Sequence, residues 1–286
     1  MIDGNSFGII GGDSRQIALA ESIASDGFTV LAVGFDSIDF ADQVKKAGLQ
    51  EVVESCENMI LPLPVTSDGV HVRMDYSDKK IVLDDAFASL MRGKQVFGGM
   101  MGKLYQTSEI WATVDTYDYY TREEFAIRNA VPTAEGAACI AMQEFPGTLN
   151  GSRCLITGFG RVGKTLALML RGIGAKVTVS ARRQSDLAWI ESCGCNSVLT
   201  EHICEGNSYD IIFNTVPAVL FNRRVLSRVK GKPLLIDLAS PPGGVDYPAA
   251  EKMGIKTIHA LSLPGKFAPK AAGEIIKNTI YNILEE

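Results

Sequence analysis

The segment 153–183 constrains the fold of this chain more than any other part of it. An apolar run that is typical of a buried strand, 154–157, ends in the pattern Gly158-x-Gly160-x-x-Gly163, and a helical pattern and a second strand, 176–180, follow. In a βαβ unit of this kind, which takes about thirty residues, the glycines and the helix N-terminus bring backbone amides to a point where a pyrophosphate can bind. The segment therefore predicts a dinucleotide-binding domain.

The tip of the second strand indicates which dinucleotide is bound. NAD sites usually place Asp or Glu there, because a carboxylate accepts hydrogen bonds from the adenosine ribose 2′-hydroxyl. This chain has Ser180-Ala-Arg182-Arg183 instead. Guanidinium groups attract a 2′-phosphate and bind it through paired hydrogen bonds. We therefore predict NADP rather than NAD; the alternative is that both arginines only begin the next helix at the surface.

Composition excludes several classes of protein. With 286 residues and 46% hydrophobic content the chain is long enough for two domains, and it has no apolar run of the roughly 18 residues that span a bilayer. A net charge of −5 without long Lys/Arg tracts argues against nucleic acid and membrane surfaces. The start of the chain lacks a basic region, so we expect a cytoplasmic protein.

The six cysteines are expected to be reduced thiols. Cys193, Cys195, His202 and Cys204 have side chains that suit zinc, but their spacing does not match the usual CxxC pairs. We predict no metal site.

The first half of the chain repeats the α/β pattern without a GxGxxG motif. Strands are expected at 6–10, 27–33, 59–63, 81–83 and 95–97, with a helix at 16–25. In the second half a helix at 132–145 leads to six strands at 154–157, 176–180, 197–199, 211–213, 233–236 and 256–259, and a last helix is expected at 271–284. The fold class is thus α/β, with two Rossmann-like doubly wound parallel-sheet domains flanking a cleft.

Ligands of open α/β sheets bind beyond the carboxyl ends of the strands, so residues that follow strands are the candidates for function. For the second domain the candidate cofactor-binding residues are Gly158, Gly160, Arg161, Val162, Gly163, Ser180, Arg182, Arg183, Asn214, Thr215, Pro217, Asp237, Ala239 and Ser240. For the first domain the candidate substrate-binding residues are Asp13, Pro64, Thr66 and Ser67. Each of these positions could instead be an ordinary turn or salt bridge.

Cationic groups at strand ends are the candidates for the chemistry. Arg15 and Lys103 follow strands of the first domain and Lys266 follows the sixth strand of the second, where each could pair with a substrate carboxylate. Of three histidines, His259 is nearest to the inferred cleft and is the candidate acid or base, although a structural role is an alternative.

Together these motifs resemble a known family. The segments Ile10-Gly-Gly-Asp-Ser-Arg15, Leu61-Pro-Leu-Pro64, Pro132-Thr-Ala-Glu-Gly136, Asp237-Leu-Ala-Ser240 and Leu263-Pro-Gly-Lys266, with the glycine pattern, resemble the A subunit of bacterial dipicolinate synthase over the full length. The wider architecture is similar to alanine dehydrogenase, adenosylhomocysteinase and D-2-hydroxyacid dehydrogenases, whose last helix returns to the first domain. This implies a substrate domain of residues 1–131 plus 271–286 and an NADP-binding domain of residues 132–270.

The resemblance also implies a reaction. It is NADP-linked oxidation of dihydrodipicolinate, or its hydroxy-tetrahydro precursor, to dipicolinate, performed with a flavoprotein-like B subunit of dipicolinate synthase in the mother cell of a sporulating bacterium, by an enzyme that forms a homo-oligomer. Arg15, Lys103 and Lys266 would orient the two carboxylates. The chain lacks the Pro-His-x-x-Gly motif of D-2-hydroxyacid dehydrogenases after its sixth strand, so their histidine mechanism is not implied. Alternatives are a non-catalytic dinucleotide-binding or sensor subunit and a dehydrogenase of another small amino or hydroxy acid.

Overall fold

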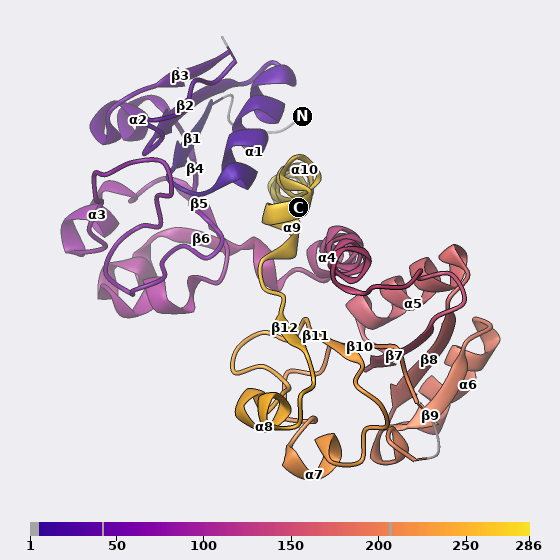
Figure 1. The fold of residues 1–286 in the computed structure, drawn as a ribbon. Coiled ribbons are helices and arrows are strands. Elements are labelled where there is room, and N and C mark those ends of the chain that lie inside the picture. The colour runs from indigo at the N-terminus through magenta and orange to yellow at the C-terminus, as the bar shows by residue number, and fades with distance from the viewer. Residues whose placement is uncertain (1–5, 42, 206–207) are drawn as a thin grey trace. The chain divides into compact units, whose positions relative to one another are not determined.

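The computed structural model describes residues 6–41, 43–205 and 208–286, so the first residues, on which the expectation of a cytoplasmic protein partly rests, lie outside it. The chain divides into two compact units (Figure 1). Unit 1 contains the described residues up to Asn129 together with Ala268–Glu286, and unit 2 is Ala130–Phe267. Each unit is built around a six-stranded sheet in which every neighbouring pair is parallel, which confirms the predicted α/β class with two Rossmann-like domains.

The sheet of unit 1 has the order β3-β2-β1-β4-β5-β6. Its strands are β1 (Ser6–Ile10), β2 (Thr29–Val33), β3 (Val44–Lys46), β4 (Asn58–Ile60), β5 (Gln95–Gly98) and β6 (Asp115–Asp118). Its helices are α1 (Ser14–Ser25), α2 (Leu49–Ser55), α3 (Asp85–Leu90) and α10 (Pro269–Glu285), with short 3₁₀ helices η1 (Met101–Gln106), η2 (Glu109–Thr113) and η3 (Tyr119–Thr121).

Sequence patterns missed both edge strands of this sheet. β3 and β6 carry charged and polar residues, as edge strands commonly do, and therefore lack an apolar run. The strand predicted at 81–83 was wrong. Val82 forms only an isolated bridge with His71 and is 46% exposed.

The sheet of unit 2 has the order β12-β11-β10-β7-β8-β9, so both sheets follow the order 3-2-1-4-5-6 of doubly wound nucleotide folds. Its strands are β7 (Arg153–Thr157), β8 (Lys176–Ala181), β9 (Asn196–Leu199), β10 (Ile211–Asn214), β11 (Leu234–Asp237) and β12 (Thr257–His259). Its helices include α5 (Arg161–Ile173), α6 (Gln184–Ser192), α7 (Arg223–Leu226), α8 (Tyr247–Lys252) and α9 (Leu263–Phe267), with the 3₁₀ turn η4 (Thr200–His202). All six predicted strands are confirmed.

Helix α4 (Glu123–Glu144) is longer than predicted. The predicted start at Pro132 was wrong, because proline often marks the first turn of a helix but here lies inside it. The better signal is the pair Glu123-Glu124, since acidic residues favour the first turn. The boundary between the two units falls inside this helix.

The last helix completes unit 1. α10 packs along α1, and an added Cβ on Gly273 would lie 2.8 Å from the backbone nitrogen of Leu19, so the glycine permits the close approach. Ile276 and Ile280 are buried in the core with Phe7, and Lys277 Nζ donates to Asp26 at 2.8 Å. The C-terminal segment therefore belongs structurally to the first unit.

Two general properties bear on function. Among the described residues, no helix is both long and apolar enough to cross a membrane. Within the same residues, no group of three or more His, Cys, Asp and Glu side chains is placed to hold a metal ion. His202 pairs instead with Glu201 and Glu205.

Candidate functional site

The glycine turn after β7 leaves an open cradle. Gly158 has φ of 94°, a left-handed conformation that favours glycine, and an added Cβ on Gly163 would come well inside 3.0 Å of the Gly158 carbonyl oxygen. Gly160 caps α5 without a side-chain hydrogen bond, and an added Cβ there would meet no described atom within 4 Å beyond its own neighbours. The N-cap residue therefore places no side chain over the first turn of α5, and these residues fit the pyrophosphate of a dinucleotide.

A buried polar chain ties together the ends of three neighbouring strands. Thr157 Oγ1 donates to Asn214 Oδ1 at 2.6 Å, and Asn214 Nδ2 donates to Asp237 Oδ1 at 2.8 Å. All three side chains are fully buried. Asn214 and Asp237 were predicted to contact the cofactor. In the structure their side chains bond to each other, and Asn214 also bonds to Thr157, so these contacts connect the strand ends at the candidate site.

The Asp237 carboxylate also fixes the loop that follows β11. It accepts hydrogen bonds from the backbone amides of Ala239 (3.1 Å) and Gly244 (2.8 Å) and from the Tyr247 hydroxyl (2.7 Å). Burial, together with the hydrogen bond and charge of Asp237, raises the pKa of Tyr247 above its usual range. Tyr247 therefore remains a protonated donor to the carboxylate.

His259 lies at the end of β12, beside this loop. Its Nε2 is 3.2 Å from the carbonyl oxygen of Ala239, and its ring centroid is 5.4 Å from that of Tyr247. Because a carbonyl oxygen only accepts hydrogen bonds, the contact places the proton of the neutral ring on Nε2. Nδ1 of this exposed side chain is then left as an acceptor.

A hollow of about 420 Å³ lies at the carboxyl ends of β8 and β9, where a doubly wound fold holds the adenosine end of a dinucleotide. Arg182 and Arg228 are among its lining residues, with Thr200, Glu201, Val219 and Leu220. Arg183 is exposed but is not part of this lining and is the N-cap residue of α6. The two adjacent arginines therefore have different surroundings.

The remaining predicted cofactor residues divide into buried and exposed positions. Ser180 is fully buried, and its carbonyl oxygen accepts a hydrogen bond from the Gly158 amide at 3.0 Å. The Thr215 hydroxyl donates to Thr157 O at 2.8 Å, close to the glycine turn. Ala239 is buried and Val162 half-buried, whereas Arg161, Pro217 and Ser240 are exposed.

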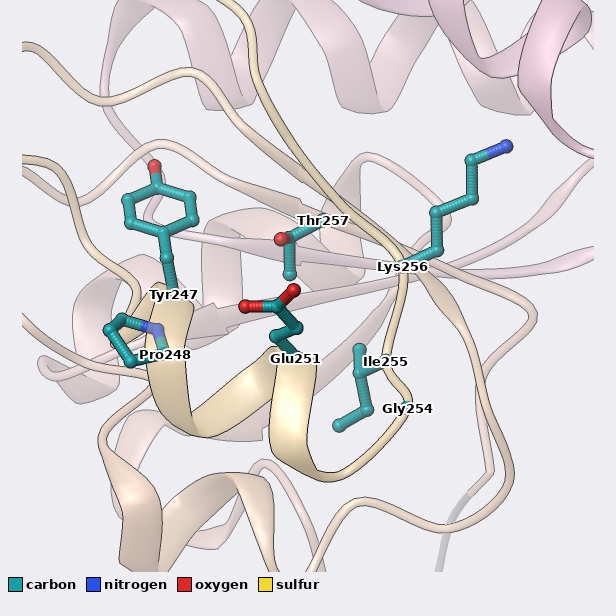
Figure 2. Close-up of a pocket in the computed structure, with 7 residues that line it drawn as sticks. All are labelled: Tyr247, Pro248, Glu251, Gly254, Ile255, Lys256 and Thr257. Atoms are coloured by element: carbon teal, nitrogen blue, oxygen red, sulfur yellow. The ribbon is translucent and has the colours of Figure 1, made fainter.

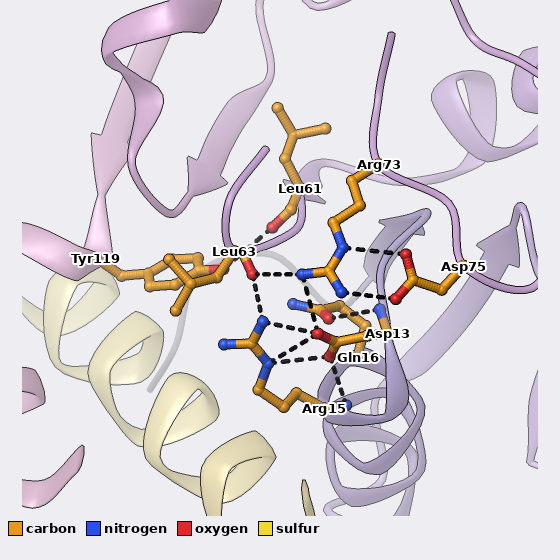
Figure 3. A network of polar contacts seen from close by, with 8 residues as sticks. All are labelled: Asp13, Arg15, Gln16, Leu61, Leu63, Arg73, Asp75 and Tyr119. Atoms are coloured by element: carbon orange, nitrogen blue, oxygen red, sulfur yellow. Dashed lines mark hydrogen bonds and ion pairs between the residues drawn. The ribbon is translucent and has the colours of Figure 1, made fainter. Parts of the chain in front are cut away.

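At the corresponding edge of unit 1, Asp13 occupies the helix N-terminus itself (Figure 3). Its carboxylate caps α1 by accepting from Arg15 N at 3.0 Å, and it pairs with Arg15 Nη2 at 2.7 Å and Arg73 Nη1 at 3.2 Å. The Leu63 carbonyl oxygen accepts from both guanidinium groups. Arg15 is therefore a buried partner of Asp13 and not a free cation at the surface.

Segment 72–75 covers the glycine turn of unit 1. Met74 pairs with Gly12 in a bridge, and an added Cβ on Gly11 would lie 2.7 Å from the Met74 side chain. The Met74 side chain therefore covers the turn, and the Asp13 carboxylate occupies the N-terminus of α1. In contrast to unit 2, this turn leaves no open cradle for a pyrophosphate.

The other predicted residues of unit 1 are Pro64, Thr66 and Ser67 in one loop and Lys103 in η1, which contacts that loop. Thr66 is buried, and its hydroxyl donates to Asp68 Oδ1 at 3.1 Å and accepts from Gly69 N at 2.9 Å. Lys103 is exposed and its Nζ donates to Ser67 O at 3.0 Å, while Pro64 follows a cis peptide bond. Lys266 is exposed on α9 of unit 2.

A further hollow of unit 2, of about 550 Å³, lies between α8 and the amino end of β12 (Figure 2). Glu251 points into it, and Lys256 at its rim pairs with Glu144 at 2.7 Å. It contains none of the predicted site residues. Tyr247 at one end of its lining reaches Asp237, but the rest of the lining, 248, 251 and 254–257, lies toward the amino end of β12, so we do not assign the hollow to the site.

Comparison with known proteins decides the family. Residues 6–110 match the family of the N-terminal domain of the A subunit of dipicolinate synthase, and residues 123–240 match "D-isomer specific 2-hydroxyacid dehydrogenase, NAD binding domain". The chain is 34% identical to the A subunit of dipicolinate synthase of Bacillus subtilis (strain 168), over 100% of this chain and 98% of that protein. The chain belongs to the family of dipicolinate synthase A subunits. The resemblance seen in the sequence is confirmed.

Solved structures agree with this assignment. The A subunit of dipicolinate synthase from Bacillus halodurans superposes with a TM-score of 0.90 at 32% identity, covering 100% of this chain and 99% of that chain. A transhydrogenase from Sinorhizobium meliloti, with a TM-score of 0.69 and 16% identity over 98% of this chain and 93% of that chain, shares the fold. The match of the NAD-binding domain indicates a nicotinamide dinucleotide as the cofactor of this family member.

Three functional candidates in this family member were missed from the sequence. Arg73 lies in a segment without regular structure and far along the chain from the glycine turn, and only the fold brings it to Asp13. Arg228 lies in the turn after α7 and Tyr247 is the first residue of α8, so neither directly follows a strand. The one available signal was the position of Tyr247 shortly after a predicted strand end.

The Asp13 pair gives unit 1 a pH dependence. Burial alone would raise the pKa of Asp13, but hydrogen bonds from Arg15 and the charges of Arg15 and Arg73 outweigh it and hold that pKa below 3.8. The ionised carboxylate therefore contributes its full stabilisation of the fold at pH values above its ordinary pKa. This contribution is lost as the pH falls through the lowered pKa of the folded state. We expect Asp13→Asn to lower the stability of unit 1 at pH 7 and to flatten its decline below about pH 4.

Urea unfolding followed by the fluorescence of Trp111 measures this effect. Trp111 is buried in unit 1 and the other tryptophan, Trp189, is 67% exposed in unit 2, so a Trp189→Phe background leaves one reporter. Equal pH slopes for the parent protein and the Asp13→Asn variant would contradict the expected role of the carboxylate, because the other acidic groups are common to both.

Proposed function

We propose that this member of the family is an NADP-dependent oxidoreductase that converts dihydrodipicolinate, or its hydroxy-tetrahydro precursor, to dipicolinate together with the B subunit of dipicolinate synthase. The observation that carries the choice of NADP is Arg182 in the hollow, because the tip of β8 offers no carboxylate; the two carboxylates of the lining, Glu201 and Glu205, follow β9 instead. The names of the Bacillus relatives support the product. We place the protein in the cytoplasm of the mother cell of a sporulating bacterium, as a homo-oligomer.

The chemistry divides between cofactor and chain. When bound, the nicotinamide accepts a hydride, so that dihydrodipicolinate and NADP⁺ give dipicolinate, NADPH and a proton, whereas the hydroxy-tetrahydro precursor must first lose water. Nδ1 of His259 is the acceptor we propose for the proton, since its Nε2 is held by Ala239 O. Lys103 and Lys266 each have an exposed ammonium group that can pair with a substrate carboxylate. Arg15 forms an ion pair with Asp13 and so fixes the position of that carboxylate.

A pair of matched variants tests the cofactor. Arg182→Asp is expected to weaken NADP binding by about tenfold to a hundredfold, because it removes a charge-assisted hydrogen bond to the 2′-phosphate and adds a like charge, and to leave NAD binding unchanged or improved. Arg183→Asp makes the same charge change one residue away, outside the lining of the hollow, and should have a much smaller effect. Calorimetry with both dinucleotides measures this, and equal effects of the two variants would count against a 2′-phosphate site at Arg182.

Turnover then separates the candidate functions. The purified chain is mixed with NADP and dihydrodipicolinate, with and without the B subunit, and nicotinamide absorbance is followed. Reduction of NADP supports the proposed reaction. Binding without reduction in either mixture would favour a non-catalytic dinucleotide-binding or sensor role. Reduction by alanine, lactate or similar acids alone would indicate another dehydrogenase.

A further inference from the structure

Unit 1 contains a hollow of about 590 Å³ at the carboxyl ends of β2 and β3. Its apolar part includes the buried residues Ala32 and Phe35 and five partly buried side chains that pack against the core: Val33, Ala47, Leu49, Met74 and Ile81. Its polar side chains are Asp36, Lys46, Glu51, Ser77, Lys79 and Lys80. An apolar floor with a few polar groups at the rim is the usual composition of a small-molecule site.

The position of this hollow is repeated in the other unit. β2 and β3 are the second and third strands of unit 1, as β8 and β9 are of unit 2, and the two sheets have the same strand order. The hollow at β8 and β9 is the one in which a doubly wound fold holds adenosine. Unit 1 therefore has a comparable space at the place where such a fold binds a nucleoside.

Asp36 supplies the group that a ribose needs at this place. It lies shortly beyond the end of β2, in the lining of the hollow, where a carboxylate accepts hydrogen bonds from ribose hydroxyls in NAD sites. The carboxylate is oriented by the Ser77 hydroxyl and by Lys79 Nζ at 3.0 Å. Lys80, at the same rim, has no ion pair among the described residues and is available to an anion.

Met74 limits the size of the ligand. An added Cβ on Gly34 would lie 2.6 Å from Met74 Sδ, and the same side chain covers Gly11. The path from the hollow to the N-terminus of α1 is therefore closed, and that N-terminus is already capped by Asp13. A dinucleotide cannot extend its pyrophosphate along this path, whereas a single nucleoside can end at its ribose.

We propose that unit 1 carries a mononucleoside site in this hollow, which takes adenosine or its 5′-monophosphate with the ribose hydroxyls on Asp36 and the base against the apolar floor. The site is distinct from the dinucleotide site proposed for unit 2. Its ligand would be a regulator of the enzyme or a separate substrate of unit 1, and in either case the first property to establish is binding.

The test titrates adenosine into the full chain saturated with NADP, by calorimetry. One further equivalent per chain is expected to bind. Asp36→Asn should weaken adenosine at least about tenfold, since it removes a charged acceptor, and Ala47→Leu should weaken it by filling the floor without touching Ser77 or Lys79. Asp78→Asn, an exposed residue of the same segment outside the lining, should match the parent protein.

Three results would overturn the proposal: no saturable adenosine binding, equal affinity in the Asp36 and Ala47 variants and the parent, or inorganic phosphate binding at the hollow in place of adenosine. NADP affinity is measured for each variant and should be unchanged. If no dinucleotide binds to the chain at all, the proposed function fails, but the adenosine titration on the free chain still decides this inference, because the variants assign the binding to unit 1.

Discussion

Gly163→Ala is expected to abolish dinucleotide binding by unit 2. The added methyl group would come well inside 3.0 Å of the Gly158 carbonyl oxygen, and that atom belongs to the backbone of the turn, so relief requires α5 or the turn to move. Either movement displaces the first amides of α5, which we assign to the pyrophosphate. Calorimetry with NADP and NAD should therefore detect no saturable binding to the variant.

Gly172→Ala is the matched control in the same helix. An added Cβ at Gly172 meets no described atom within 4 Å beyond its own neighbours, so the substitution should raise helix stability by about 0.5–1 kcal/mol and leave the affinity for dinucleotide unchanged. If Gly163→Ala bound NADP as the parent protein does, the glycine turn would not be the pyrophosphate site.

Asp237→Ala is expected to lower the free energy of unfolding of unit 2 by about 3–5 kcal/mol. The buried carboxylate accepts hydrogen bonds from Asn214, Ala239, Gly244 and Tyr247, and its removal leaves four donors without this partner. Urea unfolding monitored by circular dichroism measures the loss. Tyr247→Phe removes only one of these donors and should cost about 1 kcal/mol.

The comparison of the two variants decides how Asp237 acts. A large loss of stability with Asp237→Ala, and a small one with Tyr247→Phe, would assign the carboxylate to the framework of the strand ends. If Asp237→Ala unfolded at the same urea concentration as the parent and instead lost NADP affinity alone, Asp237 would be a direct cofactor ligand, as the sequence had predicted.

The core of unit 2 could be predicted from sequence because its strands are buried on both faces. Such strands, β10 (Ile211–Asn214) for example, are nearly continuous apolar runs, and the glycine turn connects one of them, β7, to helix α5. The edge strands β3 and β6 could not be predicted, since they are short, consist mostly of charged and polar residues and have no apolar period.

The candidate site could be predicted only in part. The position of Asp237 and Arg15 near the end of a predicted strand identified both as residues at the ligand-binding edge of a sheet. Their hydrogen-bond and ion-pair partners, however, determine their roles. Asp237 is satisfied by backbone amides of its own loop and Arg15 by Asp13, and neither contact follows from a spacing rule. Arg73 reaches Asp13 only because segment 72–75 crosses the glycine turn, which is a property of the tertiary fold.

The return of α10 to α1 has a consequence for biosynthesis. Unit 2 is one uninterrupted segment, whereas unit 1 is formed by residues that precede and residues that follow that segment. During translation, all strands of unit 2 are made before α10, so the apolar side of α1 that receives Ile276 and Ile280 stays uncovered until α10 has been made. A nascent chain of this enzyme is therefore expected to finish its second unit first, and chaperone binding should concentrate on the N-terminal half.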